Sequence, residues 1–485
     1  MNSKKTIIVG SGLSALMMAR MIKKYRDPMA DIVILEKEEQ VGGQYGSINY
    51  GEYGYFDIGM HIIYETCIPE IDNLFEDLLP EEDWIILDNN YKDIAGIYVN
   101  GRLQTDTPYV DLRNSSPEKW REYIAELFQV IRENKHKSLP DSPTSYDLLV
   151  HHFGKKITDE IFVPILEKLY FKHPSELAEI ANKFTTINRL ALFDSSTMLD
   201  LMQSEEIRAR ICYPDQLTMP TYRQNTQKGF YPRKYGMHRV ISRFREQLEM
   251  EGVSFMTSCS INKLQRTEHR IDSVEVKDKT GNLSVLSVKE LFWTAGLPGL
   301  AAVLGIPVKD LTFEKKKTSD VYVNLLFDKK PEMGDLYYFY PFDKEFRSFR
   351  VTNYTNYCPS AAGERGFPMC VEFWAREEDE KTTENLILLA TNELKAFGVI
   401  DDSYKVLFGK VESTMAGFPL PSVTNINTMN TINQRINDAG ISNLTATGVL
   451  TGKNVFFIKD VLIDTYKKVT GQRLPQQLSV VKNAG

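Results

Sequence analysis

The chain has 485 residues, which is enough for two or three domains of roughly 100–200 residues each. A hydrophobic content of 42% and a charged content of 25% are those of an ordinary globular protein. The formal net charge of -7 argues against nucleic acid as the main partner, because phosphate binding requires clustered Lys and Arg side chains.

The first residues, M-N-S-K-K, lead directly into a predicted strand. There is no apolar leader with a cleavage site in this part of the sequence, and no stretch approaches about 18 uninterrupted apolar residues. We therefore expect a cytoplasmic protein without a transmembrane helix, and we do not expect a membrane partner.

Residues 6–15 read T-I-I-V-G-S-G-L-S-A, a β-branched run that enters a glycine turn and continues into an apolar helix pattern. In a dinucleotide-binding strand–turn–helix, Gly10 allows the tight turn and Gly12 lets the backbone approach the phosphates. Ala15 takes the small position at which the helix packs on the strand, and the first helical N–H groups face the pyrophosphate. The turn residues predicted to bind the dinucleotide are Gly10, Gly12, Leu13, Ser14 and Ala15.

A second predicted strand, Asp31–Leu35, ends at Glu36, an acid placed about 20 residues beyond the glycines to accept hydrogen bonds from ribose hydroxyl groups. The sequence V-G-G-Q-Y-G-S follows at 41–47, and a Gly-Gly step after the ribose acid is typical of two-domain flavoproteins. The pattern favours FAD over NAD, although a lone glycine motif also occurs in ordinary strand-to-helix turns. The residues of this segment predicted to bind the cofactor are Glu36, Lys37, Gly43 and Gln44.

A block of helical periodicity follows, roughly over residues 106–224. Apolar residues recur at helical spacing in several of its segments. These segments are Pro117–Asn134, Ser145–Phe153, Asp159–Tyr170 and Thr197–Arg210. We interpret the block as a mostly helical insertion into the nucleotide-binding fold.

Strands and helices then alternate again. The pattern predicts a helix at Met237–Met250, followed by strands at Val253–Thr257, Arg270–Val276 and Glu290–Thr294. Residues 318–376 alternate β-branched and aromatic side chains between turn signals, which predicts an antiparallel sheet. Near the end, a strand at Asn443–Gly448 enters a glycine turn, and a helix is predicted at Asn454–Val469.

These elements predict an α/β fold with a discontinuous Rossmann-type FAD-binding domain. We assign residues 1–105, 225–305 and 405–485 to that domain. The mostly helical insertion takes residues 106–224, and an antiparallel-sheet substrate domain takes residues 306–404.

The cysteines and histidines give no sign of a metal site. The five cysteines are scattered without C-x-x-C spacing, which fits free thiols in a reducing compartment. His151 and His152 are adjacent, so on a helix they point in different directions. We therefore predict no metal.

With these elements in order, the chain resembles the flavoprotein superfamily of protoporphyrinogen oxidases, amine oxidases and UDP-galactopyranose mutases, and above all the mutase branch. Phe56–Tyr64 (F-D-I-G-M-H-I-I-Y) is similar to that branch's F-D-x-G-G-H loop beside the flavin. Gly229–Val240 looks like the phosphate-side loop that leads into a helix. Phe339–Pro359 resembles the mutase strand pair whose second strand supplies an arginine to the substrate, and Arg350 falls there.

The resemblance implies further site residues. Arg350 and His61 are the implied catalytic residues, although a loop histidine is also often satisfied by backbone carbonyls. Arg347 ranks below Arg350 because three residues along a strand it would point to the other face. For the aromatic residues, packing in the sheet core is the alternative. The implied flavin neighbours are Gly59, Met60, His61, Gly448, Asn454 and Val455, and the implied substrate-binding residues are Tyr340, Arg350, Tyr354 and Trp374.

Two positions depart from the family pattern. Gln44 stands where the family usually has arginine, and Val449 follows Gly448 where many members have arginine. In the mutases that second arginine helps to hold charge near the flavin and the substrate diphosphate. An arginine can make two hydrogen bonds to one phosphate, so its replacement by another residue is not a conservative change. Lys453 and Lys459 would compensate in part as point charges.

The leading functional hypothesis is an FAD-dependent oxidoreductase that passes a hydride from a small polar substrate, such as a sugar or sugar nucleotide, to flavin N5. This reaction needs fewer cations than the mutase reaction. The first alternative is a UDP-galactopyranose mutase-type isomerase that uses reduced FAD as a nucleophile. The second is a flavin-binding protein without turnover. The expected partner is a small-molecule substrate, and the sequence predicts no oligomeric state.

Overall fold

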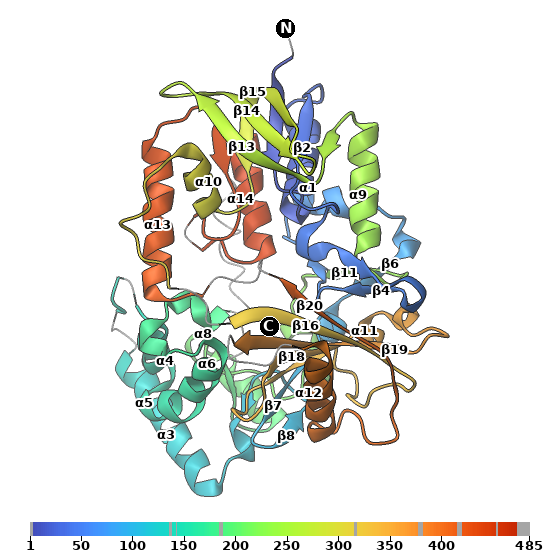
Figure 1. Ribbon diagram of the computed structural model, residues 1–485. Coiled ribbons are helices and arrows are strands. Elements are labelled where there is room, and N and C mark those ends of the chain that lie inside the picture. Colours follow the sequence, from blue (N-terminus) through green and yellow to red (C-terminus); the bar gives the residue numbers. More distant parts are fainter. Residues whose placement is uncertain are drawn as a thin grey trace. The chain divides into compact units, whose positions relative to one another are not determined.

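The computed structural model describes residues 3–134, 138–141, 143–183, 188–314, 318–376, 382–414, 420–452 and 454–472 (Figure 1). The described chain divides into two units. Unit 1 is formed by residues 3–86, 229–313 and 424–472, and unit 2 by residues 87–228 and 314–423. Each unit is described by itself.

Unit 1 is built on a parallel sheet whose strands come from all three of its chain segments. The strand order is β12-β2-β1-β15-β21, with every neighbouring pair parallel. In Figure 1 the blue β1 and β2 therefore share a unit with the yellow-green β15. The strands of this sheet are β1 (Lys5–Val9), β2 (Ile32–Leu35), β12 (Ser254–Met256), β15 (Leu283–Trp293) and β21 (Leu444–Ala446).

Strand β15 changes partners along its length. Its first half pairs antiparallel with β14 (Ile271–Asp278), which in turn pairs with β13 (Cys259–Arg266). Its second half pairs with β1 and β21. The same strand thus carries a β-ribbon at one end and the centre of the parallel sheet at the other.

Smaller elements and helices complete unit 1. The helices are α1 (Leu13–Tyr25), α2 (Pro69–Glu76), α9 (His238–Met250), α10 (Leu297–Leu304), α13 (Val423–Asp438) and α14 (Ile458–Thr470). The short strands are β3 (Ser47–Asn49), β4 (Tyr55–Asp57), β5 (Ile63–Tyr64), β6 (Trp84–Leu87) and β11 (Gly229–Pro232). β3 pairs with β4, and β11 lies between β5 and β6.

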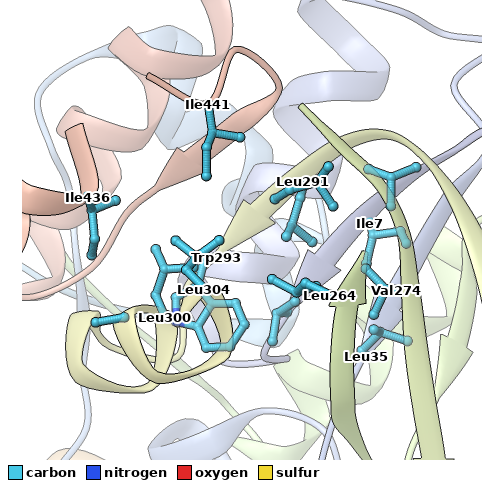
Figure 2. Close-up of a cluster of buried hydrophobic side chains, with 14 of the residues drawn as sticks. Ile7, Leu35, Leu264, Val274, Leu291, Trp293, Leu300, Leu304, Ile436 and Ile441 are labelled. Carbon is cyan, nitrogen blue, oxygen red and sulfur yellow. The ribbon is translucent and has the colours of Figure 1, made fainter. Parts of the chain in front are cut away.

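One face of the parallel sheet carries the apolar cluster of Figure 2. Ile7 on β1 and Leu291 and Trp293 on β15 pack there with residues of α10, α13 and the β13–β14 ribbon. Ile8 and Ile34 alternate with the cluster residues and are also fully buried, so they point to the opposite face. That face is the one left for α1, which packs against α9 and α14. The sheet is thus buried on both sides, as a parallel sheet requires.

Unit 2 is built on a mostly antiparallel sheet with the order β20-β16-β19-β18-β17-β7-β8. Its strands are β7 (Ala95–Val99), β8 (Arg102–Gln104), β16 (Thr318–Phe327), β17 (Tyr338–Pro341), β18 (Ser348–Asn353), β19 (Phe367–Arg376) and β20 (Val406–Thr414). A separate pair joins β9 (Val110–Asp111) and β10 (Leu190–Ala191).

Helix α12 covers one face of this sheet. A Cβ added at Gly409 on β20 would lie 2.8 Å from the Ile387 side chain of α12, and Gly409 pairs with Leu325 on β16. The face that carries Leu325 is therefore the α12 face. The helices of unit 2 are α3 (Pro117–Asn134), α4 (Ser145–Phe153), α5 (Lys155–Ile157), α6 (Val163–Tyr170), α7 (Ser195–Leu201), α8 (Glu205–Arg208), α11 (Tyr354–Tyr357) and α12 (Thr383–Ala396).

The predicted fold class is confirmed, since a Rossmann-type sheet assembled from separate segments accompanies helices and an antiparallel sheet. Two segments differ from the predicted assignment. Strands β7 and β8, predicted within the nucleotide-binding segment, pair with the unit 2 sheet, where Ala95 lies opposite Tyr338. Strand β20, also predicted in the nucleotide-binding domain, pairs with β16. Both pairings join segments far apart in the chain, which local patterns do not reveal.

Two further findings concern the described residues alone. Within them, no helix is long and apolar enough to cross a membrane. In the same ranges, no group of three or more His, Cys, Asp or Glu side chains is arranged to hold a metal ion.

Candidate functional site

The turn after β1 has the backbone geometry of a dinucleotide site. Gly10 has a φ of +98°, and a Cβ there would lie 2.4 Å from Thr294 Oγ1, so only glycine fits. Gly12 has an ordinary φ of -64°, and a Cβ built on it would meet no atom within 4 Å. The space beside Gly12 is therefore open to a ligand.

Helix α1 begins at this open position. No side chain caps its N-terminus, and its first turn holds no acid. The Ala15 N–H bonds to the Gly12 carbonyl at 2.9 Å, and the Ala15 side chain is buried against the sheet. The helix start consequently keeps unpaired N–H groups and a positive dipole end that suit an anion. Leu13 is buried and Ser14 is half-buried in this turn.

Glu36 ties the ends of β1 and β2 together. Its Oε2 accepts hydrogen bonds from the Ser11 N–H at 2.9 Å and the Ser11 hydroxyl at 2.7 Å. Its Oε1 accepts from the Glu38 N–H at 2.9 Å. The carboxylate therefore stands at the carboxyl edge of the sheet, where a ribose would lie, with lone pairs left for further donors. Lys37 beside it is largely exposed and pairs with Glu38 at 3.3 Å.

The Gly-Gly step lies against the first turn. The Gly42 N–H donates to the Ser11 carbonyl at 3.0 Å. A Cβ on Gly43, whose φ is +54°, would lie 3.4 Å from the Gly12 Cα. Gln44 follows and is half-buried. The structure thus brings the residues predicted from the two motifs to one place.

The sequence analysis did not single out Thr294 and Thr447, which lie at this edge directly after β15 and β21. Thr294 donates its hydroxyl hydrogen to the Val9 carbonyl at 2.8 Å, and the Thr447 N–H donates to the Trp293 carbonyl at 2.9 Å. The Thr447 hydroxyl is buried and has no hydrogen-bond partner among the described residues. Strands of unit 1 therefore end side by side where open α/β sheets bind ligands. The signal for Thr294 was a glycine step, Ala295–Gly296, directly after a strand.

The loop after β21 has a strained backbone. Gly448 has a φ of +127°, and Leu450 and Asn454 also have positive φ values, of 63° and 67°. A positive φ is uncommon for leucine, and such strain clusters at ligand-binding segments. The Leu450 N–H bonds to the carbonyl of the buried Val455 at 2.8 Å, which closes the loop. Lys453 lies outside the described residues, and Lys459 is the second residue of α14.

The segment that resembles the flavin-side loop is held by a buried carboxyl group that the sequence analysis did not single out. Asp57 is 1% exposed and accepts hydrogen bonds from the hydroxyls of Ser47 at 2.6 Å and Tyr231 at 2.5 Å. The Met237 N–H, at the start of α9, donates to it at 3.0 Å. Burial raises the pKa of Asp57 despite these donors. The sequence feature that could have identified Asp57 is its position as an acid within an apolar strand.

The predicted flavin neighbours follow Asp57 directly. Gly59 is buried with a φ of +71°, and Met60 is half-buried. The half-buried His61 ring lies 4.9 Å from the Tyr45 ring, centroid to centroid. Burial raises the pKa of Tyr45. The Gly-Gly segment and the flavin-side loop therefore meet at these two rings.

In unit 2, Arg350 lies on the sheet face opposite α12. It is paired in register with Glu372, and its Nε and Nη2 donate to the two carboxylate oxygens at 2.5 and 2.8 Å. The Arg350 side chain is 17% exposed and that of Glu372 1%. Burial lowers the pKa of Arg350, but the charge of Glu372 outweighs burial and holds the pKa well above its ordinary value. The two side chains form a charge-neutral unit.

Tyrosines flank this pair. The Tyr340 hydroxyl hydrogen-bonds with Arg350, and burial raises the Tyr340 pKa. Tyr322 on β16 lies opposite Glu372 on its other side. The structure thus brings together Arg350 and Tyr340 of the predicted substrate residues.

The other predicted substrate residues make different contacts in unit 2. Tyr354 is fully buried in α11 with its ring 6.2 Å from that of Tyr357, so it belongs to the core. Trp374 stacks on Phe349 with ring centroids 4.4 Å apart. A β-bulge between Ser348 and Arg350 inserts Phe349, and this re-aims its ring.

Comparisons with known proteins agree with this geometry. Residues 8–78 match the NAD(P)-binding Rossmann-like domain family. The fold is similar to that of a reduced UDP-galactopyranose mutase, with a TM-score of 0.71 and 14% identity over 99% of this chain and 98% of that one. A candidate protoporphyrinogen oxidase from Exiguobacterium sp. 255-15 gives a TM-score of 0.67 and 15% identity over 97% and 99% of the chains.

The chain thus shares the fold of these two solved structures. The resemblance predicted from the sequence, to the mutase, protoporphyrinogen oxidase and amine oxidase superfamily, is thereby confirmed at the level of the fold. A curated relative, the 1-hydroxycarotenoid 3,4-desaturase of Flavobacterium sp. (strain P99-3), is 23% identical over 307 residues. That match covers 58% of this chain and 56% of the desaturase, so it spans just over half of the relative's length.

Proposed function

We propose that the chain is an FAD-dependent enzyme that holds its cofactor at the carboxyl edge of the unit 1 sheet. The observation that carries this proposal is the open space at Gly12 in front of the uncapped start of α1. A pyrophosphate placed there would meet unpaired N–H groups, while Glu36 receives the ribose hydroxyls. Among the described residues, the buried Thr447 hydroxyl at the same edge has no hydrogen-bond partner, and a polar ligand group would supply one.

We further propose that the enzyme is an oxidoreductase for a small polar substrate, with sugars and sugar nucleotides as the first candidates. When bound, FAD accepts a hydride or, once reduced, supplies a nucleophilic nitrogen, and the protein binds and orients the reactants. Arg350 is already neutralised by Glu372, and position 449 carries valine. A departing diphosphate would find less positive charge at each of these two positions than at a free arginine.

Within the proposed substrate site, Arg350 and Tyr340 would orient polar groups of the substrate. The bidentate contact with Glu372 fixes the guanidinium plane, so its remaining N–H groups keep one direction. Tyr340 offers a hydroxyl beside it. Neutral hydroxyl or amide groups of the substrate suit this charge-neutral Arg–Glu pair better than a phosphate group does.

The mutase remains the second candidate because the chain aligns over nearly its full length with the reduced UDP-galactopyranose mutase. Lys459, the second residue of α14, would supply part of the positive charge that Val449 does not. A flavin-binding protein without turnover is the third candidate.

One anaerobic experiment separates these candidates. The purified protein would be examined for a flavin spectrum, reduced with dithionite and given UDP-galactofuranose. Formation of UDP-galactopyranose would establish the mutase, whereas a reduced flavin without conversion would favour the oxidoreductase. Sugar donors that bleach the oxidised flavin would then identify the substrate. A bound flavin that no donor or acceptor changes supports the third candidate, and absence of any flavin band would refute the cofactor.

A further inference from the structure

The tip of the β7–β8 hairpin is a two-residue turn of unit 2 that the proposed flavin chemistry does not use (Figure 1). Asn100 and Gly101 form the turn, and Val99 pairs with Arg102 across it. Both turn residues are exposed and have positive φ values, of 54° and 73°. Positive values at both positions are those of a type I′ hairpin turn, for which Asn-Gly is a favoured sequence. The chain contains this dipeptide once.

The carboxylate of Asp343 occupies this turn. Asp343 lies in the connection between β17 and β18, and its Oδ1 accepts a hydrogen bond from the Asn100 N–H at 2.8 Å. Its Oδ2 accepts one from the Gly101 N–H at 2.7 Å. Successive N–H groups of a turn form a concave anion site, and here an acid of the same chain fills it. The preceding residue adds a contact, since the Phe342 N–H donates to the Tyr98 carbonyl at 2.7 Å. The tip is therefore fastened to the β17–β18 connection.

Asparagine followed by glycine is the dipeptide that loses its side-chain amide most readily, because glycine has no side chain to hinder ring closure. The Gly101 nitrogen attacks the side-chain carbonyl carbon of Asn100, so that a new C–N bond forms and the bond from that carbon to the side-chain nitrogen breaks. The side-chain NH2 group leaves as ammonia with the proton that the Gly101 nitrogen gives up. Water then opens the five-membered imide, so water is the one co-reactant that the conversion needs.

The observed turn keeps the reacting atoms apart. In a left-handed residue the next backbone nitrogen points away from Cβ, so the Gly101 nitrogen reaches the Asn100 side chain only after rotation about the Cα–C bond of Asn100. That rotation withdraws the Gly101 N–H from Asp343. A hydrogen bond to a charged group is one of the stronger hydrogen bonds in proteins, so breaking it raises the barrier to ring closure. The contact with Asp343 therefore opposes deamidation.

We infer that Asn100 is a deamidation site whose conversion to aspartate or isoaspartate is held back by Asp343. The inference concerns the chain's own backbone, so it is independent of the proposed flavin reaction. Conversion adds a negative charge beside the N–H groups that bind Asp343, and like charges repel. In the isoaspartyl form the backbone also gains one carbon, which does not fit a two-residue turn. Deamidation would consequently release the hairpin tip from the β17–β18 connection.

Mass spectrometry of the aged full-length chain measures the conversion. Trypsin cuts after Lys92 and Arg102 and releases residues 93–102, in which Asn100 is the only side-chain amide. The reference is the free peptide of the same sequence, incubated in the same mildly alkaline buffer. We expect the intact chain to convert at least about tenfold more slowly than the free peptide. Equal rates would overturn the inference, because the folded turn would then give no protection.

Asp343→Ala tests the cause of the protection. Without the carboxylate the turn rotates more freely, so this variant should convert at least about tenfold faster than the original chain. Asp401→Ala is the matched control, since Asp401 is another acid of unit 2 that accepts a turn N–H, from Ser403 at 2.8 Å. We expect the control to convert as slowly as the original chain.

Two outcomes of this comparison would overturn the inference. Equal acceleration in both variants would mean that the substitutions act through overall stability and not through the hairpin tip. Slower conversion of Asp343→Ala than of the original chain would mean that the carboxylate acts as a base that promotes ring closure.

Asp343→Asn separates protection from folding. Asparagine keeps the shape of the side chain, but its carbonyl oxygen is its only acceptor, because its NH2 group is a donor. We expect a melting temperature close to that of the original chain and a conversion rate between those of the original and Asp343→Ala. An Asp343→Asn chain that converts as slowly as the original would contradict the inference, because neither the charge of Asp343 nor its second acceptor oxygen would then matter.

Discussion

Gly10 and Gly12 stand two residues apart and are constrained differently. Gly10 has a positive φ, and the Thr294 side chain fills the place of its Cβ. Gly12 has an ordinary φ and open space at that place. The first glycine is therefore required by the protein itself, and the second only by a ligand that approaches the backbone.

We predict that Gly12→Val folds with little change in stability but no longer retains a dinucleotide. The valine side chain would occupy the space in which a phosphate approaches. The measurement is the flavin absorbance per mole of purified protein, together with thermal unfolding of the apo form. Normal flavin content in this variant would refute the position of the nucleotide site.

Gly10→Ala is the matched control for that experiment. A non-glycine residue in a strained backbone region costs roughly 1–3 kcal/mol, and the new Cβ would also displace Thr294. We expect this variant to lose stability even without cofactor. The pair of variants thus distinguishes a loss of binding from a loss of folding.

His238 at the start of α9 should make stability depend on pH. Burial lowers its pKa to about 4, its ring stacks on Tyr55 at 3.7 Å, and its Nδ1 lies 3.2 Å from the Ser47 hydroxyl. Between pH 6.5 and 4 the unfolded chain binds a proton that the folded chain does not, so stability falls as the pH is lowered through that window. Denaturant unfolding at pH 7 and pH 4.5 measures the fall.

His238→Gln tests the origin of this pH dependence. Glutamine keeps a polar side chain but does not titrate, so the variant should lose less stability between pH 7 and 4.5 than the original chain does. His152, whose pKa burial also lowers to about 4, retains its own contribution in both proteins. Parallel stability curves for the two chains would show that the pKa of His238 is the same in the folded and the unfolded chain, and would contradict the prediction.

Some residues of the candidate site can be predicted from local sequence patterns, whereas others are placed there by partners far away in the chain. Gly12 and Glu36 belong to one motif within about 25 residues, so the sequence alone places them together. Asp57 meets Tyr231 and Met237 across more than 170 positions, and Glu372 meets Arg350 across a strand pair. No spacing rule connects such residues before the fold is known.

At the scale of elements, the cross-strand pair of β18 and β19 determines how Arg350 can be tested. Removing one partner of a buried ion pair leaves the other charge uncompensated, which typically costs roughly 3–5 kcal/mol. We expect Arg350→Ala to destabilise unit 2 by that order, since Glu372 would be left 1% exposed and unpaired by arginine. Chemical denaturation of the variant measures the loss.

The double variant Arg350→Met with Glu372→Met separates this loss from substrate binding. Two apolar side chains of similar volume should restore most of the stability. If Arg350 also contacts the substrate, the double variant folds but binds substrate more weakly than the original chain. A double variant as unstable as Arg350→Ala would show that the charge pair is not what unit 2 depends on.

The sequence predicts helix bounds correctly where a single amphipathic pattern has clear start and stop signals. Pro117–Asn134 and Ser145–Phe153 have the predicted bounds, the second with a Thr144 capping box. The predicted helix at 159–170 instead contains a π-helical turn at Thr158–Phe162 before α6. The predicted helix at 197–210 divides into α7 and α8, because Ser204 accepts a hydrogen bond from the Ile207 N–H and begins a new helix. Apolar periodicity continues through such interruptions, so it does not reveal them.

At the scale of the molecule, unit 1 depends on chain segments that are far apart. The glycine motif and the residues that match the Rossmann-like family lie within residues 8–78. The neighbours of that segment come later, since β1 pairs with β15 and α1 packs on α9 and α14. A strand pattern predicts β1, but it does not reveal that one of the two strands that pair with β1, strand β15, lies about 280 residues further along the chain.

We predict that residues 1–228 expressed alone neither fold cooperatively nor bind FAD, although they contain the complete glycine motif. Without β15, strand β1 would be an exposed edge, and α1 would lose the helices that bury it. Co-expression with residues 229–485 should restore flavin binding, since the cut falls between the exposed Lys228 and the first residue of β11. Flavin absorbance and far-ultraviolet circular dichroism of the purified fragments measure both outcomes. A fragment 1–228 that retains flavin on its own would mean that the discontinuous sheet is not required for the nucleotide site.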